Sequence, residues 1–191
     1  MKKLMFYAMI AVAFILCFSC ENETVNPSNS SVATNLGAEV IPAISTQYSN
    51  EEIAEMIRLF SISREVDVIP PAELQQKFRT DFPNAYDIEW EFGADIYEVE
   101  FEIRYRDYEV YYDRQGVLLM CITEIMLSEL PSVVKNAAQA KYPEYSFEDI
   151  DKISRGSEVF YKIEMERFLS DSEVNLLIKS DGVILNETID Y

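Results

Sequence analysis

The chain has 191 residues, of which 34 are Asp or Glu and only 16 are Lys or Arg, so its formal net charge is −18 at pH 7. It contains no histidine, which excludes histidine-based triads, histidine metal ligands and histidine pH switches. The negative charge argues against binding to nucleic acid or to an anionic membrane surface, because phosphate contacts need clustered Lys and Arg. It is compatible with a cationic partner, and also with a surface that only keeps the protein soluble.

Residues 1–20 have the pattern of an export signal rather than of a folded segment. Lys2 and Lys3 precede an apolar run over 4–16, and Ser19 stands before Cys20. This order resembles a bacterial lipoprotein signal, which implies removal of residues 1–19 and lipid attachment at Cys20. The alternative is an uncleaved membrane anchor, for which the apolar run is short. We expect a lipid-anchored protein of the cell envelope, on the periplasmic face or the surface of the outer membrane, which touches the membrane only through its N-terminal lipid.

Three cysteines are present, and the signal accounts for Cys17 and Cys20. Only Cys121 remains for the mature chain, so no intrachain disulfide is expected there. Cys121 lies in an apolar run and is expected to be a small buried strand residue. A role as a catalytic thiol is disfavoured because the chain has no histidine to activate it.

The segment before the duplicated region divides into two parts. Residues 20–48 are rich in Asn, Ser, Thr and Pro and are expected to form a flexible tether. Residues 49–69 are expected to add an extra helix and a link. Ser49-Asn50-Glu51-Glu52 is a helix start signal, a capping residue followed by acids in the first turn, and apolar residues recur at helical spacing over 53–60. We expect a helix at about 50–61 whose apolar face packs on the duplicated region.

The second half of the chain contains the same unit twice. The matched segments are Pro71 with Pro131, Phe82-Pro83 with Tyr142-Pro143, 97–102 with 161–166, and 114–118 with 180–184. The matches keep their order with small insertions, as a duplication requires. We therefore place the first copy at 70–127 and the second copy at 128–191.

Each copy is predicted to be one helix followed by four strands. Pro71 and Pro131 suit the first turn of a helix, and Pro83 and Pro143 end it. The segments that follow alternate apolar and polar residues, as strands with one buried face do. The predicted fold class is α+β, with two tandem α-β-β-β-β repeats that form a curved antiparallel sheet of about eight strands. The helices are expected on one face and solvent on the other.

These features resemble a known family. A lipoprotein signal, tandem helix-plus-sheet units, an aromatic-Pro pair at each helix end and late hairpin turns at 113–116 and 180–182 are similar to those of the PepSY-like secreted proteins. That family is likened in fold to the beta-lactamase inhibitor protein. The resemblance covers roughly residues 70–191 and implies a non-enzymatic envelope protein, with binding or inhibition of another protein through its open sheet. It supplies no catalytic residues.

A row of acids in the first copy is the first candidate binding surface. Glu98, Glu100 and Glu102 share one side of a predicted strand, and Glu89 and Glu91 of the preceding strand are expected to point the same way. Three interpretations stay open, namely a solvated face, a surface for a basic protein or peptide, and a calcium site. A flat strand face spreads carboxylates apart, whereas calcium sites gather oxygens from a flexible loop, so no metal is expected.

Three further residues extend this candidate surface, and they are Arg104, Glu109 and Tyr111. Tyr111 is out of phase with the apolar residues of its strand, so the alternation predicts that it points outward beside Glu109 and Arg104. Tyrosine and arginine are enriched at protein interfaces.

The sequence therefore predicts a non-catalytic protein that binds a protein or peptide, which is expected to be basic, through an open acidic face. The alternative is a structural or accessory lipoprotein with no ligand on that face. An enzyme ranks third, because glycoside hydrolysis by paired carboxylates needs a cleft that an open sheet does not supply. We expect no cofactor and no nucleic-acid partner, and pairing of edge strands would give a homodimer.

Overall fold

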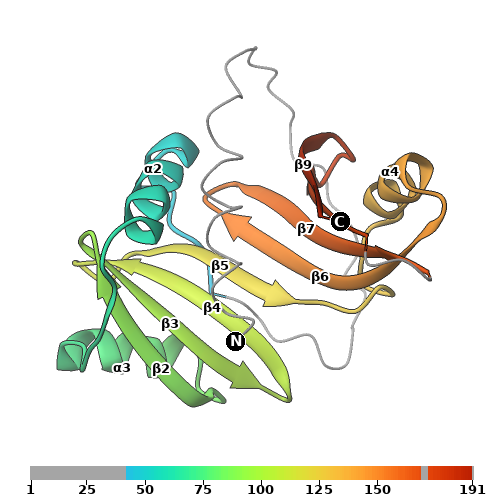
Figure 1. Cartoon of the computed structure of the whole chain (residues 1–191). Helices are drawn as coiled ribbons and strands as arrows, with labels where there is room; N and C mark the ends of the chain where they lie inside the picture. Colours follow the sequence, from blue (N-terminus) through green and yellow to red (C-terminus); the bar gives the residue numbers. More distant parts are fainter. Residues whose placement is uncertain (1–41, 169–171, 191) are drawn as a thin grey trace, which may run out of the picture.

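A computed structural model of the chain describes residues 42–168 and 172–190 (Figure 1). The expected signal over 1–19, Cys20 and residues 21–41 of the expected tether lie outside the described residues. The described residues form three helices and nine strands. The helices are α2 (Asn50–Ser61), α3 (Ala72–Asp81) and α4 (Ser132–Lys141). The strands are β1 (Val66–Asp67), β2 (Tyr86–Gly93), β3 (Ile96–Ile103), β4 (Arg106–Asp113), β5 (Leu118–Glu124), β6 (Tyr145–Arg155), β7 (Glu158–Arg167), β8 (Glu173–Lys179) and β9 (Ile184–Asp190).

All nine strands belong to one antiparallel sheet in which each strand pairs with its neighbours in the chain, from β1 to β9. Strands β2–β5 come from the first copy and β6–β9 from the second. The two copies join where β5 pairs with β6, from Met120 opposite Arg155 to Glu124 opposite Asp151. The predicted α+β fold of two tandem units is confirmed, and the short β1 adds a ninth strand from the link that follows α2.

The two repeat helices cover the same face of the sheet, as predicted. Each begins directly after a proline, Pro71 before α3 and Pro131 before α4. Leu74 and Phe78 of α3 pack on alternate residues of β3 and β4, whereas Val134 and Ala138 of α4 pack on β7 and β8. Each helix therefore covers the apolar face of its own copy.

Helix α2 forms where the sequence predicts it. The Ser49 hydroxyl accepts a hydrogen bond from the Glu52 amide at 3.2 Å, and the Glu52 carboxylate accepts one from the Ser49 amide at 2.8 Å. These two bonds satisfy donors that a helix start leaves unpaired. The helix then buries Ile53, Ile57 and Phe60.

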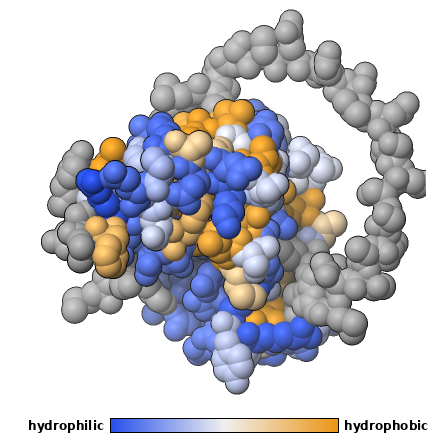
Figure 2. Space-filling model, turned by 90° about the vertical axis from the view of Figure 1, so that its right-hand side faces the viewer, coloured by the Kyte–Doolittle hydropathy of each residue, from blue (hydrophilic) through white to orange (hydrophobic). Residues whose placement is uncertain are grey.

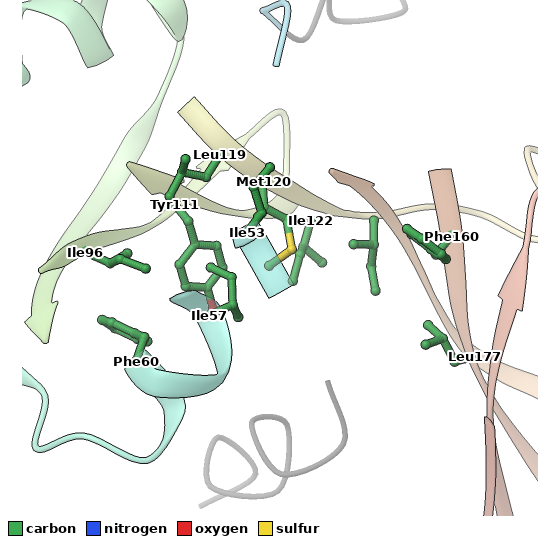
Figure 3. Close-up of a cluster of buried hydrophobic side chains, with 11 residues drawn as sticks. Ile53, Ile57, Phe60, Ile96, Tyr111, Leu119, Met120, Ile122, Phe160 and Leu177 are labelled. Carbon is green, nitrogen blue, oxygen red and sulfur yellow. The ribbon is translucent and has the colours of Figure 1, made fainter. Parts of the chain in front are cut away.

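The position of α2 corrects the expectation of an open face. Figure 1 shows α2 and α3 on opposite sides of the first copy's strands. Ile57 and Phe60 pack in one cluster with Tyr111, Met120 and residues of the second copy (Figure 3). The face of the sheet opposite α3 and α4 is therefore covered in part by α2. The apolar stripe of this helix has to be buried against another element, as an amphipathic helix requires.

Two glycines show that α2 and its link touch both copies. A Cβ at Gly156, in the turn between β6 and β7, would collide with the Asn50 side chain at the start of α2. A Cβ at Gly93, at the end of β2, would collide with the Ser63 hydroxyl just after α2. The helix segment thus extends from a hairpin of the second copy to a hairpin of the first copy.

The surface is mixed in character. On the side of the molecule where α4 lies, hydrophobic residues form separate patches among hydrophilic ones (Figure 2). Within the ranges that the structure describes, no helix has the length and apolar character needed to cross a membrane.

Candidate binding face

The acids predicted for a binding surface share one face of the sheet, the face that carries α2. The register puts Glu89 opposite Glu100, and Glu100 opposite Glu109. One rung away, Glu98 lies between Glu91 and Tyr111. The prediction that these side chains point the same way is confirmed.

Their exposure differs from the prediction. Glu89 and Arg104 are exposed, and Glu91, Glu100, Glu102 and Glu109 are half-buried. Glu98 and Tyr111 are each only 1% exposed, so the expectation that they lie on an open surface is wrong. The physical reason is α2, whose Phe60 ring meets the Tyr111 ring edge-on with centroids 5.7 Å apart.

Glu98, Glu109 and Tyr111 form a compact polar group beneath α2. The Tyr111 hydroxyl lies 2.8 Å from Glu98 Oε1 and also contacts Glu109 Oε1. The side chains of Glu98 and Glu109 are hydrogen-bonded to each other, and burial raises the pKa of Glu109 to about 7. The charges of Glu100 and Asp151 raise this pKa further. Ionisation of all the carboxyl groups of this cluster at the same time is therefore strongly disfavoured.

The expectation that the strand face spreads its carboxylates apart does not hold at this point. Carboxylate oxygens of Glu98, Glu100 and Glu109 lie within 4.8 Å of one another. Two of the three are hydrogen-bonded side chains that share the Tyr111 hydroxyl, and such a contact is typical of carboxyl groups bridged by a proton. We therefore do not assign these residues as metal ligands.

The remaining predicted residues lie around this group. Glu91 is hydrogen-bonded to Glu65 of the link after α2, and burial and the Glu91 charge raise the pKa of Glu65. Glu102 accepts a hydrogen bond from the Tyr86 hydroxyl at 2.6 Å. Arg104 lies in the turn between β3 and β4, where its φ is +54°.

Sequence reasoning missed the second copy's part of this face. Asp149 and Glu164 are paired across β6 and β7, and Asp151 pairs with Glu124 across the junction between the copies. Glu164 occupies the position of Glu100 in the repeat, so the duplication itself contained the signal. We call the following eight exposed or half-buried residues the acidic face: Glu89, Glu100, Glu102, Asp107, Glu124, Asp149, Asp151 and Glu164.

The acids of the two copies act on one another. Burial raises the pKa of Asp151 to about 6, with Asp149, Glu124 and Glu164 adding to the rise and Lys162 opposing it. The pKa of Glu124 is raised by burial and by the charges of Asp149 and Asp107. The negative potential is therefore continuous across the junction between the copies.

The two copies differ in the side chain that occupies one buried position of the repeat. Lys162 holds the repeat position of Glu98, and its ammonium lies 3.9 Å from a carboxylate oxygen of Asp151. Leu177 lies opposite Lys162, as Tyr111 lies opposite Glu98. The second copy thus neutralises its buried charge with an ion pair, whereas the first copy places two carboxyl groups together.

Cys121 has no part in this face. It is fully buried among the residues that pack on α3, as predicted. Burial raises the pKa of its thiol to about 11. A thiol in this state is a poor nucleophile.

The sequence matches the family described as "Putative beta-lactamase-inhibitor-like, PepSY-like" twice, over residues 61–120 and 122–186. The matches together span more than half of the chain, and the chain belongs to this family. The two matches agree with the tandem duplication. No match was found among curated proteins.

Solved structures share the fold at low sequence identity. A BLIP-like protein from Bacteroides fragilis is 24% identical with a TM-score of 0.53, over 64% of this chain and 87% of that one. A DUF2874 family protein from Bacteroides uniformis is 20% identical with a TM-score of 0.56, over 63% and 90% of the two chains. A structure described as "putative periplasmic proteins" from Bacteroides eggerthii is 18% identical with a TM-score of 0.57, over 64% and 90%.

Proposed function

We propose that this protein is a lipid-anchored, non-catalytic protein of the cell envelope that binds a basic protein or peptide on the acidic face. The observation that carries the proposal is that acids of both copies lie on one face of the sheet and meet at the β5–β6 junction, where Glu124 lies opposite Asp151. A field of one sign attracts an oppositely charged partner and speeds its association. The face offers a surface of this kind that extends over two repeats.

The envelope location is supported by two independent observations. The order of Lys2, Lys3, the apolar run and Cys20 is that of a lipoprotein signal. A protein of similar fold from Bacteroides eggerthii is described as periplasmic. Inhibition of a partner enzyme is one form that the binding would take, since the family is described as beta-lactamase-inhibitor-like.

The alternative function, a structural lipoprotein with no ligand on this face, is favoured by one observation. Tyr111, the aromatic residue expected to contact a partner, is buried inside the fold against Phe60.

A homodimer formed by pairing of edge strands also stays a prediction. Its two candidate edges among the described strands are the two-residue β1 and the seven-residue β9.

Charge reversal on the acidic face tests the proposal. The full chain would be used to capture partners from an envelope extract at low and high salt, and each captured protein would then be purified and titrated. The double variant Glu102→Lys and Asp149→Lys changes one acid in each copy. The matched control, Glu51→Lys and Glu73→Lys, makes the same charge change on exposed residues of α2 and α3.

The proposal predicts a basic partner whose affinity falls at least about tenfold in the acidic-face variant and with rising salt, but not in the control. Equal affinity of both variants would place the binding surface elsewhere. Absence of any saturable partner at low salt would favour the structural alternative.

A further inference from the structure

The hairpin between β3 and β4 ends in a two-residue tip whose backbone conformation is unfavourable for the residues that it carries. Arg104 and Tyr105 have φ values of +54° and +63°. A type I′ hairpin turn requires this left-handed region at both positions, and Asn and Gly adopt it at the lowest cost. A bulky side chain with such a φ is an outlier, and outliers of this kind are concentrated at functional sites.

Other turns of the same sheet use residues that suit a positive φ. Gly116, Gly156 and Gly182 have φ values of +78°, +53° and +90° in the turns that follow β4, β6 and β8. The turn between β2 and β3 uses the small Ala94 and Asp95, and Asp tolerates the left-handed region better than most residues. The tip of the β3–β4 hairpin therefore departs from the pattern of these turns. Such a departure is expected where a side chain is kept for a purpose other than the fold.

The Tyr105 side chain contributes little to the packing of the fold. At 94% exposure it is the most exposed large hydrophobic residue in the part of the chain that the structure describes. Its backbone is held in place, because the Tyr105 amide donates a hydrogen bond to the Tyr86 hydroxyl at 3.1 Å and that hydroxyl donates one to Glu102 at 2.6 Å. The tip is thus preorganised with its aromatic side chain in solvent, which reduces the entropy lost when a partner binds it.

A second exposed apolar turn lies beside this tip. The Glu129 carboxylate accepts a hydrogen bond from Arg106, directly after the tip, at 2.8 Å and one from the Met126 amide, also at 2.8 Å. Met126 and Leu127 are 63% and 38% exposed. We call Tyr105, Met126 and Leu127 the tip patch. Tyr and Met are enriched at protein interfaces, and the flexible Met side chain adapts to the surface that it meets.

The tip patch adjoins the acidic face. Glu102 and Asp107 of that face lie opposite each other close to the tip, and Glu124 ends the strand that leads to Met126. An apolar centre with a charged rim is the usual anatomy of a protein interface. The charge of this rim fits a basic partner and disfavours an anionic membrane surface.

The tip patch also lies away from the place where the N-terminal segment joins the sheet. The Ser45 amide donates a hydrogen bond to the Leu118 carbonyl at 3.1 Å, and the Tyr48 hydroxyl donates one to Asp113 at 2.8 Å. Leu118 begins β5 and Asp113 ends β4, whereas the tip precedes β4 and the second turn follows β5. The length of a strand, roughly 20 Å, separates these two ends. With the proposed lipid anchor on the N-terminal side, this placement favours a protein over a lipid surface as the occupant of the patch.

We propose that the tip patch is the apolar anchor for the partner of the acidic face, a basic protein or peptide whose apolar side chains pack on Tyr105, Met126 and Leu127 while its Lys and Arg residues face the acids beside them. This inference rests on the proposed function and deepens it. The acidic face sets the rate and the salt dependence of association, and the tip patch adds contact area that salt does not weaken. Tyr105 thereby takes the role that the alternation in β4 assigned to Tyr111.

Two synthetic peptides test the anchor on the full chain by isothermal titration. They have the same length and the same number of lysines, and the residues between the lysines are leucine in one and serine in the other. The wild type is expected to bind the Lys/Leu peptide at least about tenfold more tightly than the Lys/Ser peptide. Tyr105→Asn with Met126→Ser should reduce this preference to less than about threefold. The matched control Ile69→Asn removes a side chain that is 91% exposed in the link before α3, and it should keep the preference. Retention of the preference in the tip variant overturns the proposal.

Charge reversal separates this inference from the proposed function. Glu124→Lys with Asp149→Lys spares the residues that hold the tip, so it should weaken both peptides by a similar factor and leave the Lys/Leu preference unchanged. If it weakens both peptides while the tip variant keeps the preference, the acidic face binds without this anchor, and only the further inference is wrong. If neither peptide responds to charge reversal or to salt, the proposed function fails and this inference fails with it.

The unfolding temperature distinguishes a docking role from a structural one. Asn adopts a positive φ at a lower cost than Tyr, and the hydrogen bond to Tyr86 uses the backbone amide, which the variant keeps. Tyr105→Asn should therefore unfold at the temperature of the wild type or up to about 4 °C higher. A lower unfolding temperature would mean that the Tyr105 ring stabilises the fold itself, and it overturns the proposal.

Fluorescence quenching tests a lipid surface as the occupant. The variant Tyr105→Trp adds an indole at the tip, and the full chain would be incorporated into phosphatidylcholine vesicles with brominated acyl chains. Quenching is expected to equal that of the wild type, whose one tryptophan, Trp90, packs on Phe78. Stronger quenching in the variant would place the tip in the bilayer and contradict a protein-binding anchor.

Discussion

At the residue scale, the two copies place different ionisable side chains, Glu98 and Lys162, at the same buried position of the repeat. Glu98 is 1% exposed and Lys162 is 8% exposed, and they hold the same position of the repeat. A buried charge is costly unless it is paired. Lys162 has Asp151 as a partner, whereas Glu98 shares Tyr111 with Glu109. We therefore expect removal of the charge to have opposite effects on the free energy of unfolding at the two positions.

Removing the lysine tests this difference. Lys162→Met is expected to lower the free energy of unfolding by about 2 kcal/mol at pH 8, because Asp151 is left without its cation. Lys162 opposes the rise in the pKa of Asp151, which is about 6, so the variant raises it further. The loss should therefore be smaller at pH 5, where Asp151 is largely protonated. Urea unfolding at both pH values measures it.

The double variant Lys162→Met with Asp151→Asn is the control for that experiment. It removes the unpaired carboxylate and should recover most of the stability lost at pH 8. A loss that is equal at pH 5 and pH 8 would show that packing, not charge, causes it.

The wild-type chain should become less stable as the pH rises from 5 to 8. Glu109 and Asp151 have pKa values raised to about 7 and about 6 in the fold, so the folded state binds more protons than the unfolded state over this range. The free energy of unfolding then falls with pH, and one shift of two units corresponds to roughly 3 kcal/mol. Groups with lowered pKa values, such as Glu52 and Glu187, are ionised in both states above pH 5 and do not oppose it.

Guanidinium unfolding curves at half-unit pH steps would measure this dependence, since that denaturant also screens surface charge and leaves the buried groups dominant. Stability that rises between pH 5 and pH 8 would contradict the assigned burial of these acids.

At the scale of the element, α2 shows how far the sequence could predict the site. The capping residue and the spacing of Ile53, Ile57 and Phe60 predicted the helix and its apolar stripe, because these are local patterns. The face on which it packs depends on contacts between distant segments. The alternation of apolar and polar residues in β3 and β4 predicted that the face of the sheet bearing Glu98 is exposed to solvent. This reasoning holds only where no other element covers that face.

One sequence feature did point to cover on both faces. The run from Leu118 to Ile122 is apolar at every position, and each of these five residues is buried. A strand that is apolar without alternation is typical of burial on two sides. Combined with the unpartnered stripe of α2, it would have placed the helix over β5 and Tyr111 beneath it.

Phe60 is the largest of the buried side chains of α2. It is fully buried and meets Tyr111 edge-on, so Phe60→Ala should lower the free energy of unfolding by about 3 to 4 kcal/mol. The neighbouring Leu59 is 42% exposed, and Leu59→Ala should cost less than about 1 kcal/mol. Thermal unfolding of both variants at pH 6, below the pKa of about 7 of Glu109, separates packing from charge. Equal losses would mean that α2 is not seated as described.

At the scale of the whole molecule, the duplication explains what could be predicted and what could not. Two matched units, each with its proline-bounded helix, define the meander and the side on which α3 and α4 pack. The acids of the second copy became part of the same face only through the junction between β5 and β6, where Glu124 meets Asp151. No pattern within one repeat contains that contact.

The same junction predicts that the two copies unfold together. They share the β5–β6 ladder, and the cluster beneath α2 contains Tyr111 of the first copy with Phe160 and Leu177 of the second. Ile163→Ala removes a fully buried side chain from the second copy only, at an expected cost of about 3 kcal/mol. The only tryptophan, Trp90, lies in the first copy with its ring 5.3 Å from that of Phe78. The variant should therefore shift the urea midpoint of Trp90 fluorescence and that of far-ultraviolet circular dichroism by the same amount. An unchanged fluorescence midpoint would mean that each repeat folds alone and that α2 does not couple them.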